Sequence, residues 1–284
     1  MELNQFLELI DFTGKFNNII FIMNIFLTGG SGFVGRSIIS KISTRYNIHS
    51  PPSNELDLTN FTQLENLMNR ANFDFIINCA VRGGRRTKVD TEKDFYNNIK
   101  ILDNILYFVN KNTKLITFSS GAEIYNANEF YGFSKKISTL LIKNKNNIKN
   151  LRLYNVFGEL GMQDSFIYVA IQKCLNNEDI IIWENKVFDT YYIDDLMNLI
   201  EMLICNNCST YEEIDCVYEQ KYKLSDIAEL IKSISGSNSK IIIENDNNLI
   251  YMGAYKNNLI TNPIKKSLTN MIEYIYNKKL NNDG

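Results

Sequence analysis

Short apolar runs alternate along the first half of the chain with longer segments whose apolar residues recur every three or four positions. The apolar runs lie at about 24–28, 73–78, 114–119 and 151–155, and the periodic segments at about 33–45, 61–71, 91–111 and 131–146. Continuous apolar runs of this length are typical of buried strands, and the three-to-four-residue spacing is typical of helices. Strands that alternate with helices predict an α/β fold with a doubly wound parallel sheet, which binds ligands at the carboxyl ends of its strands.

The pattern continues beyond residue 160 with shorter elements. It predicts strands near 180–183, 214–218 and 240–244 and helices near 165–176, 194–205 and 224–235. We expect most of these elements to build a second, smaller lobe, and the helix at 194–205 to pack back on the main sheet.

Composition and charge narrow the classes of partner. The 284 residues carry 30 Lys and Arg against 32 Asp and Glu, a formal net charge of −2. A chain so nearly neutral gives no reason to expect a nucleic acid or a membrane surface as partner. The five cysteines are an odd number, which argues against a disulfide framework and for a reducing, cytoplasmic compartment.

The N-terminal segment precedes the first predicted strand. Residues 1–22 contain the apolar run 19–22, but acidic residues come before it and no small-residue cleavage site follows. We therefore expect no transmembrane span and interpret residues 1–22 as an N-terminal extension without a part in the chemistry.

Histidine and cysteine are too sparse for several kinds of site. Cys205 and Cys208 have the spacing of half a metal site, but no second pair accompanies them and His49 is the only histidine. We predict no bound metal and expect these cysteines to pack at a helix end. The scarcity of histidine also excludes Ser-His-Asp and Cys-His mechanisms.

A glycine-rich turn joins the first strand to the first helix. It reads Thr28-Gly29-Gly30-Ser31-Gly32-Phe33-Val34-Gly35. Glycines allow a tight turn and let backbone N–H groups approach a pyrophosphate at the helix N-terminus, where the dipole favours negative charge. A strand, a glycine turn and a helix form the context that a dinucleotide fingerprint requires. The alternative is a glycine-rich turn without a ligand.

Tyr131 and Lys135 are four residues apart in a segment with helical spacing, so they can share one helix face. A phenol keeps its proton to about pH 10, and a fixed ammonium beside it favours the phenolate. Such a pair can pass a proton to or from a sugar hydroxyl or carbonyl. The alternative is a solvated helix face, and the glycine turn upstream is what favours the catalytic interpretation.

Together these motifs resemble the extended short-chain dehydrogenase/reductase family, the NAD-dependent epimerase/dehydratase family, in its nucleotide-sugar branch. The resemblance runs from about Met23 to the C-terminus, and further segments match in order: Asp57-Leu58-Thr59, 73–80, 95–99, 115–120, 151–158 and 192–196. It implies a Rossmann domain at 23–160, with 190–210 packing back on it, and mainly a substrate-binding lobe at 161–284.

The resemblance also implies roles for individual residues. Tyr131 and Lys135 match the catalytic pair, and Asn155 matches an Asn that meets the phosphates of a nucleotide sugar. The implied cofactor contacts are Gly29, Gly32, Phe33, Val34, Gly35, Asp57, Leu58, Ala80, Asn98, Tyr131 and Lys135.

The catalytic hydroxyl is where the sequence departs from the family. Relatives place a Ser or Thr four residues before the Tyr that matches Tyr125, and that position here is Gly121. We predict that Ser120, one place earlier, donates to the substrate oxygen, and we name Glu123 as a second substrate-site candidate. The alternative is that the serines only cap the strand end. Tyr131 would then work with a weakened oxyanion site, at a cost of about 3 kcal/mol.

A second departure concerns the substrate phosphates. Relatives carry an Arg just before the Asp that matches Asp189, and this chain has Phe188 there. We predict that Lys186 takes over the phosphate contact, as a point charge and without the bidentate fork of an Arg.

The choice of cofactor depends on the residues that follow the second strand, near 46–49. A carboxylate there would hydrogen-bond the ribose hydroxyls and repel a 2′-phosphate, and none is present; Glu55 stands further along. Arg36, Lys41 and Arg45 are close enough in sequence to offer positive charge. We therefore predict NADPH, with NAD as the alternative.

Within the family, the segments 79–86 and 55–58 look most like GDP-fucose synthase, and the short C-terminal lobe is nearer to the 4-ketoreductases that make CDP-abequose and related sugars. The chain has no Cys between 119 and 131 and no His beyond His49, so the epimerase half of a fucose synthase is not expected. We predict a reductase of 4-keto-6-deoxy nucleotide sugars in surface-polysaccharide biosynthesis.

Three alternatives stay open. The chain fits a C4 epimerase with tightly held NAD, or a 4,6-dehydratase, although Ala122 replaces the Asp that precedes the Glu of the dehydratases. In another class, it fits a catalytically weakened nucleotide-sugar binding protein. By analogy with relatives, the two long helices suggest a homodimer.

Overall fold

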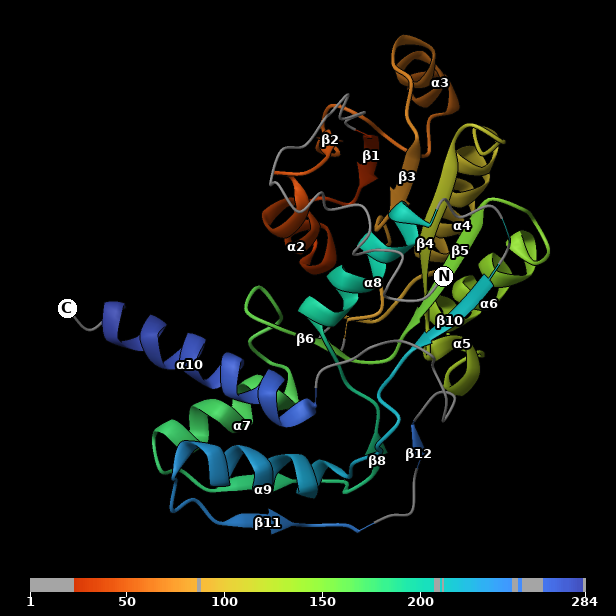
Figure 1. The fold of residues 1–284 in the computed structure, drawn as a ribbon. Helices are drawn as coiled ribbons and strands as arrows, with labels where there is room; N and C mark the ends of the chain where they lie inside the picture. The colour runs from red at the N-terminus through yellow and green to blue at the C-terminus, as the bar shows by residue number, and fades with distance from the viewer. Residues whose placement is uncertain are drawn as a thin grey trace, which may run out of the picture.

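The computed structural model describes residues 23–85, 88–206, 210, 212–246, 250–251 and 263–282. Its centre is a six-stranded parallel sheet in the order β10-β5-β4-β3-β1-β2 (Figure 1). The strands are β1 (Asn24–Thr28), β2 (Asn47–His49), β3 (Phe75–Asn78), β4 (Lys114–Ser120), β5 (Ile148–Leu153) and β10 (Glu212–Cys216). The predicted α/β class with a doubly wound parallel sheet is confirmed.

Helices cover both faces of the sheet because the strands bury side chains on both faces. On one face, the core joins Phe26 and Ile76 to α3 (Phe61–Arg70), α4 (Glu92–Leu106) and α6 (Phe130–Ile142). On the other face, Ile25 and Ile77 pack with α2 (Phe33–Ile42) and α8 (Ile193–Cys205). The continuous apolar runs in β1 and β3 are therefore the sequence signal of a sheet that is covered on both sides.

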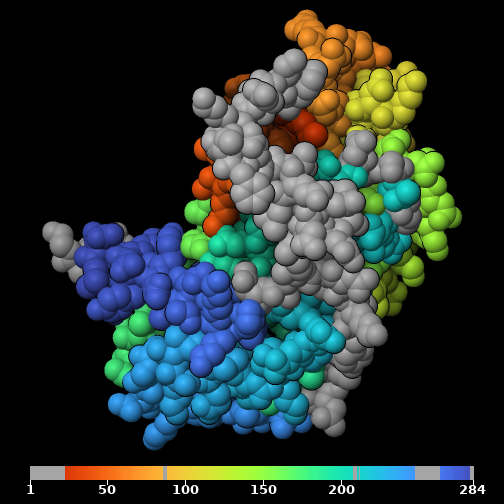
Figure 2. All heavy atoms as spheres, viewed as in Figure 1, coloured from red at the N-terminus to blue at the C-terminus, as the bar shows by residue number. Residues whose placement is uncertain are grey.

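The second lobe adjoins one end of this sheet and shares its core with the α2–α8 face. Its helices are α7 (Phe166–Leu175), α9 (Leu224–Ser235) and α10 (Ile264–Asn282), and α10 packs against α7 and α9 (Figure 2). Short parallel pairs complete it: β6 (Val156–Phe157) with β9 (Tyr191–Tyr192), β7 (Ile180–Ile182) with β11 (Ile241–Ile243), and β8 (Val187–Phe188) with β12 (Ile250–Tyr251).

Helix α8 lies across α2 on the main sheet. Arg45, in the turn after α2, pairs with Glu201 (2.6 Å), and Lys41 of α2 pairs with Asp194 at the start of α8. These contacts join residues from beyond position 160 to the first half of the chain, which carries most of the main sheet. The division at residue 160 stays a prediction, and residues 1–22 lie outside the described structure.

Two of the larger elements differ from the sequence prediction. The strand expected near 214–218 in the second lobe is β10, and it extends the main sheet beside β5, with Ile214 opposite Leu151. Helix α10 was not predicted, although Ile264, Leu268 and Met271 follow helical spacing and are buried. In the part of the chain that the structure describes, no helix combines the length and apolar character that a bilayer span requires.

Candidate active site

The glycine turn forms a cradle between β1 and α2 that has no room for side chains. Gly29 has a φ of 67°, and a Cβ there would lie 2.6 Å from the amide nitrogen of Ala80. A Cβ at Gly35 would lie 2.3 Å from the carbonyl oxygen of Gly29. Gly32 is the N-cap of α2 and supplies no side-chain cap, so the first N–H groups of the helix can serve an anionic ligand. The cradle fits the pyrophosphate of a dinucleotide.

Two side chains fix this cradle against the neighbouring strand. Thr28, the last residue of β1, donates to Asn78 Oδ1 at the end of β3 (2.7 Å), and the Ala80 N–H donates to the Thr28 hydroxyl (3.2 Å). The chain runs from β1 out to β2 and returns past β1 to β3, so Gly29 and Ala80 meet at the switch point of the sheet, where such folds bind ligands. Sequence reasoning missed Thr28 and Asn78, although two hydrogen-bonding side chains at adjacent strand ends were a usable signal.

Ser50 follows β2, at the position where a carboxylate would hydrogen-bond the ribose hydroxyls of NAD. A Cβ at Gly30 would lie 2.2 Å from Ser50 Oγ, so this hydroxyl borders the glycine turn. The basic residues that we expected here are engaged elsewhere. Lys41 and Arg45 pair with carboxylates of α8, and Arg36 donates to the carbonyl of Leu160 (3.1 Å). These three charges meet α8 and the 158–161 segment, so the structure adds no support of its own to the argument for NADPH from them.

Four further predicted cofactor residues lie beside the turn or in the loop before α3. Phe33 and Val34 begin α2 and are half-buried against the core. Asp57 accepts hydrogen bonds from the N–H (2.9 Å) and hydroxyl (2.8 Å) of Thr59, which lower the pKa of its carboxyl. Leu58 is half-buried against the core between the sheet and helices α3, α4 and α6. Their contacts with a cofactor stay predictions.

Tyr131 and Lys135 share one face of α6, next to the end of β4. The Lys135 ammonium lies 5.7 Å from the centre of the Tyr131 ring and donates to the carbonyl of Phe118 (2.6 Å). Loss of hydration lowers the pKa of Lys135 to about 8, while the charge of Glu123 raises it. The spacing that suggested the pair thus brings the phenol and the ammonium together at the carboxyl edge of the sheet.

The loop after β3 packs on the same tyrosine. Gly84 has a φ of 71°, and a Cβ there would lie 2.8 Å from the Tyr131 ring. Asn98 on α4 anchors the start of this loop, because it accepts from the Arg82 N–H (2.8 Å) and donates to the Arg82 carbonyl (2.9 Å). Asn98 also donates to Ser134 on α6 (3.2 Å). These contacts make Asn98 a structural residue, and its predicted contact with a cofactor stays a prediction.

The two serines at the end of β4 differ in their partners. Ser119 is buried and donates to Glu123 Oε2 (2.5 Å). Ser120 is half-buried, and its Oγ accepts from the Ala122 N–H (3.2 Å), a bond that does not use the hydroxyl proton of Ser120. Ser120 therefore suits a hydrogen-bond donor better than Ser119, while Gly121 offers no side chain.

Glu123, named as a substrate-site candidate, lies inside a network of protein groups. It is 7% exposed. One carboxylate oxygen accepts from Ser119 and from Thr139 of α6 (2.6 Å), and the other from Arg152 of β5. Arg152 also pairs with Asp215 of β10 (2.6 Å). These contacts point Glu123 at α6 and β5, so they do not favour the predicted substrate contact.

The family follows from the match over these segments. A family model described as the NAD dependent epimerase/dehydratase family matches residues 25–214, which include the glycine turn, the Tyr131–Lys135 pair and Asn155. The chain belongs to this family. No curated protein sequence matches the chain.

Solved structures of similar architecture include several family enzymes. The GDP-mannoheptose C4 reductase of Campylobacter jejuni with NADP bound has a TM-score of 0.75 and 17% identity, over 89% of this chain and 98% of that one. The UDP-glucose 4-epimerase of Thermotoga maritima has a TM-score of 0.74 and 16% identity, over 90% and 100%. The GDP-L-fucose synthetase of Naegleria fowleri bound to NADP has a TM-score of 0.69 and 15% identity, over 90% of this chain and 94% of that one. At such identities the likeness shows the fold.

The residues that the family pattern assigns to the substrate lie beyond β5. Asn155 is half-buried, and its carbonyl accepts from the Tyr191 N–H (2.9 Å), which joins it to β9. Lys186 lies 3.4 Å from Glu184. Asp189, which follows the position of the family's Arg, is 4% exposed at its side chain and pairs with Lys221 (2.8 Å). Sequence reasoning missed Lys221, because its distance along the chain gave no signal.

The described cysteines form no metal site. Cys205 ends α8, with its Sγ 3.9 Å from the Tyr46 hydroxyl, and Cys208 lies outside the described residues. Among the residues that the structure describes, no group of three His, Cys, Asp or Glu side chains has the arrangement of a metal site. Cys79, which follows β3, has its thiol pKa raised by burial.

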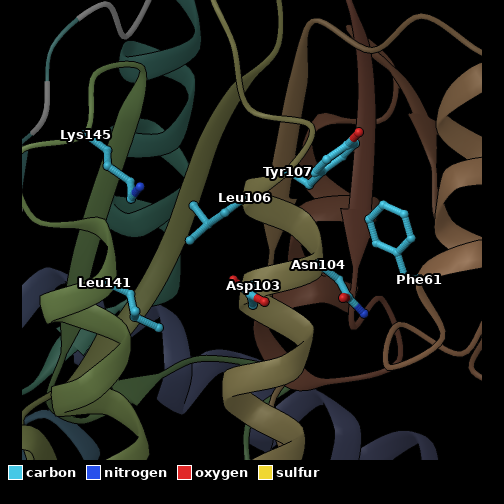
Figure 3. A pocket seen from close by; sticks show the side chains of 7 residues that line it. All are labelled: Phe61, Asp103, Asn104, Leu106, Tyr107, Leu141 and Lys145. Carbon is cyan, nitrogen blue, oxygen red and sulfur yellow. The ribbon is translucent and has the colours of Figure 1, made fainter.

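A pocket of about 340 Å³ lies between α4 and α6, with Phe61 of α3 at its border (Figure 3). Asp103, Leu106 and Tyr107 at the end of α4 line it, together with Leu141 of α6. The end of α4 leads into the start of β4, so this pocket lies at the opposite edge of the sheet from Ser120. It is not the place where this family carries out its chemistry.

Proposed function

We propose that the protein is an NAD(P)H-dependent reductase of the C4 keto group of 4-keto-6-deoxy nucleotide sugars, acting in surface-polysaccharide biosynthesis. The observation that carries the proposal is the position of Lys135: its ammonium lies beside the Tyr131 ring and is held by the carbonyl of Phe118 at the carboxyl edge of the sheet. The likeness to the C4 reductase and the fucose synthetase, both with NADP, supports it.

The cofactor site is assigned to the glycine cradle. The N–H groups at the start of α2 would hold the pyrophosphate, and the tight approach of Gly29 to Ala80 leaves the cradle open to it. Ser50 beside Gly30 would hydrogen-bond the ribose without repelling a 2′-phosphate. We therefore keep NADPH as the cofactor and NAD as the alternative. When bound, this cofactor supplies the hydride.

The protein side chains manage the proton. The Tyr131 phenol donates its proton to the substrate oxygen as that oxygen becomes a hydroxyl. The Lys135 ammonium stabilises the phenolate that this transfer leaves behind. Ser120, with its hydroxyl proton uncommitted to Ala122, hydrogen-bonds the same substrate oxygen. Asn155 and Lys186 stay our candidates for contacts with the substrate phosphates.

A second candidate function is C4 epimerisation with tightly held NAD. The similarity of fold to the UDP-glucose 4-epimerase supports this candidate, in the same way as the similarity to the C4 reductase supports the first. The dehydratase is less well supported, because Glu123 is bound to Arg152, Ser119 and Thr139. A nucleotide-sugar binding protein without turnover is the candidate of another class.

We further propose that the protein is a cytoplasmic homodimer. Helices α4 and α6 lie side by side, with Phe95 stacked on Phe133 at 5.2 Å. Large apolar side chains stand exposed along them, among them Tyr96 and Tyr107 at 60% and 70%. A second copy of this face would cover them, and the molar mass in solution tests this.

The test of function is direct. We expect purified protein to oxidise NADPH in the presence of a 4-keto-6-deoxy nucleotide sugar, followed at the absorbance of the reduced cofactor across a panel of bases and sugars. Turnover of an ordinary nucleotide hexose without added cofactor would favour the epimerase instead. Cofactor binding without turnover of any sugar would favour the binding protein.

A further inference from the structure

Glu123 and Lys135 are bound to the same two elements at neighbouring positions. Lys135 donates to the carbonyl of Phe118 (2.6 Å), and Glu123 accepts from Ser119, the next residue of β4 (2.5 Å). On α6, Glu123 accepts from Thr139 (2.6 Å), one turn beyond Lys135. The ammonium and the carboxylate are therefore held at successive residues of β4 and at successive turns of α6.

The charge of Glu123 is not cancelled by its partner Arg152. The Arg152 guanidinium also binds Asp215 (2.6 Å) and Glu213 (2.7 Å) on β10. Three carboxylates therefore surround one guanidinium, which leaves net negative charge at the end of β4, where Lys135 lies. This network deepens the proposed function, because it adjoins the residue that we assign to hold the phenol.

Within the part of the chain that the structure describes, the other groups that act on Lys135 bring no second negative charge. From β4 it meets the Phe118 carbonyl, and from its own helix the Tyr131 ring. From the segment after β3 it meets the electrostatic influence of Cys79, whose pKa burial raises, so that this thiol stays neutral. Glu123 is thus the carboxylate that acts on Lys135.

We propose that Glu123 is a positioning residue that acts through Lys135. Its buried charge, held by Arg152, Ser119 and Thr139, keeps the Lys135 ammonium protonated beside Tyr131 over the working pH range. The inference rests on the proposed function for its catalytic consequence, and on the geometry alone for the charge coupling. It gives Glu123 no contact with the substrate.

The test is a titration of Lys135 by NMR with ¹³Cε-labelled lysine, with the Lys135 signal assigned from its loss in Lys135→Met. In Glu123→Gln, which keeps the side-chain shape and leaves Arg152 with Asp215 and Glu213, we expect the midpoint to fall by about one pH unit. The matched control Glu213→Gln removes a carboxylate that binds the same Arg152 from β10, one strand further from β4, and is expected to lower the midpoint by much less than Glu123→Gln does. An unchanged midpoint in Glu123→Gln would overturn the proposal.

Two further measurements separate the possible failures. If Glu123→Gln does not fold, as judged by circular dichroism, Glu123→Asp draws the carboxylate back from α6 and should lower the midpoint in the same direction, by less. Activity should follow the titration, with the alkaline limb of kcat/KM shifted to lower pH. A raised KM for the sugar with an unmoved limb would instead make Glu123 a substrate contact. If no sugar is reduced at all, the proposed function fails, and the NMR titration still decides the coupling.

Discussion

Lys135 reaches from α6 to the carbonyl of Phe118 on β4, across a distance of 2.6 Å. Phe118 is two residues before Ser120, and Lys135 is one helix turn after Tyr131. This hydrogen bond therefore ties the helix that carries Tyr131 and Lys135 to the end of the strand that carries Ser120.

The first prediction concerns pH. Loss of hydration lowers the pKa of Lys135 to about 8, so the ammonium is present below that pH and is lost above it. We expect kcat/KM to decline on the alkaline side with a midpoint near that value, because the neutral amine stabilises a phenolate poorly. The measurement is a pH series from about pH 6 to about pH 10, with cofactor stability controlled. A flat profile over this window would contradict the role given to Lys135.

The same pKa predicts a change in stability. In the unfolded chain Lys135 binds its proton up to about pH 10.4, whereas in the folded chain it releases it near 8. The unfolded state thus holds more protons between these values, and the contribution of Lys135 to stability rises with pH across that window. Relative to Lys135→Met, the wild type should gain free energy of unfolding between about pH 7 and about pH 9.5, as chemical denaturation would show. If the difference in free energy of unfolding between wild type and Lys135→Met stays constant with pH, the lowered pKa of Lys135 is contradicted.

The third prediction concerns the loop on Tyr131. Gly84→Ala would place a Cβ 2.8 Å from the phenol ring, and the ring or the loop must shift. We expect kcat to fall by about tenfold or more, because a displacement of this order misplaces the proton donor. The measurement is steady-state kinetics with the best sugar of the panel.

A matched control for this variant is Gly236→Ala. Gly236 ends α9 with a φ of 65°, close to that of Gly84, and a Cβ there would meet nothing within 4 Å. It should cost about 1 kcal/mol of stability from the backbone alone and leave kcat unchanged. Equal losses of activity in both variants would show that the contact with Tyr131 is not the cause.

The fourth prediction concerns the cradle. Gly35→Ala would bring a Cβ within 2.3 Å of the Gly29 carbonyl oxygen and push the turn into the space meant for the pyrophosphate. We expect NADPH binding, followed by the fluorescence of the reduced cofactor, to weaken by at least about tenfold. Unchanged affinity in a folded variant would place the cofactor elsewhere.

The main sheet could be predicted because both of its faces are buried, which makes its strands read as continuous apolar runs. β10 was assigned to the wrong part of the molecule because Glu212 and Glu213 are exposed and Asp215 is engaged by Arg152, so the strand lacks that pattern. Helix α10 was missed because its apolar residues, although spaced as in a helix, stand among many lysines and asparagines. The boundaries of most other elements were within a few residues.

The site could be predicted only where its residues are close in sequence. The glycine turn and the Tyr131–Lys135 pair each depend on residues a few positions apart, and both are present in the structure as the sequence predicted. The partners of Glu123, Lys41 and Asp189 come from distant segments, and which side chain meets which depends on how helices and strands are set against one another. Asp189 with Lys221 and Glu123 with Arg152 are such pairs, and neither has a signal in the sequence.

The fifth prediction concerns the proton donor. Tyr131→Phe keeps the ring against Gly84 and removes the hydroxyl. We expect NADPH binding to stay within about twofold of wild type and kcat to fall by about a hundredfold to ten-thousandfold. Full activity in this variant would remove Tyr131 from the mechanism.

The central claim is that hydride reaches C4 of a keto sugar. The most direct measurement uses NADPH deuterated at the transferred position, a 4-keto-6-deoxy nucleotide sugar and NMR of the product. The account predicts one deuterium at C4 of the sugar, in step with the NADPH consumed and lost in Tyr131→Phe. Product that carries no deuterium at C4, or turnover without consumption of NADPH, would contradict it.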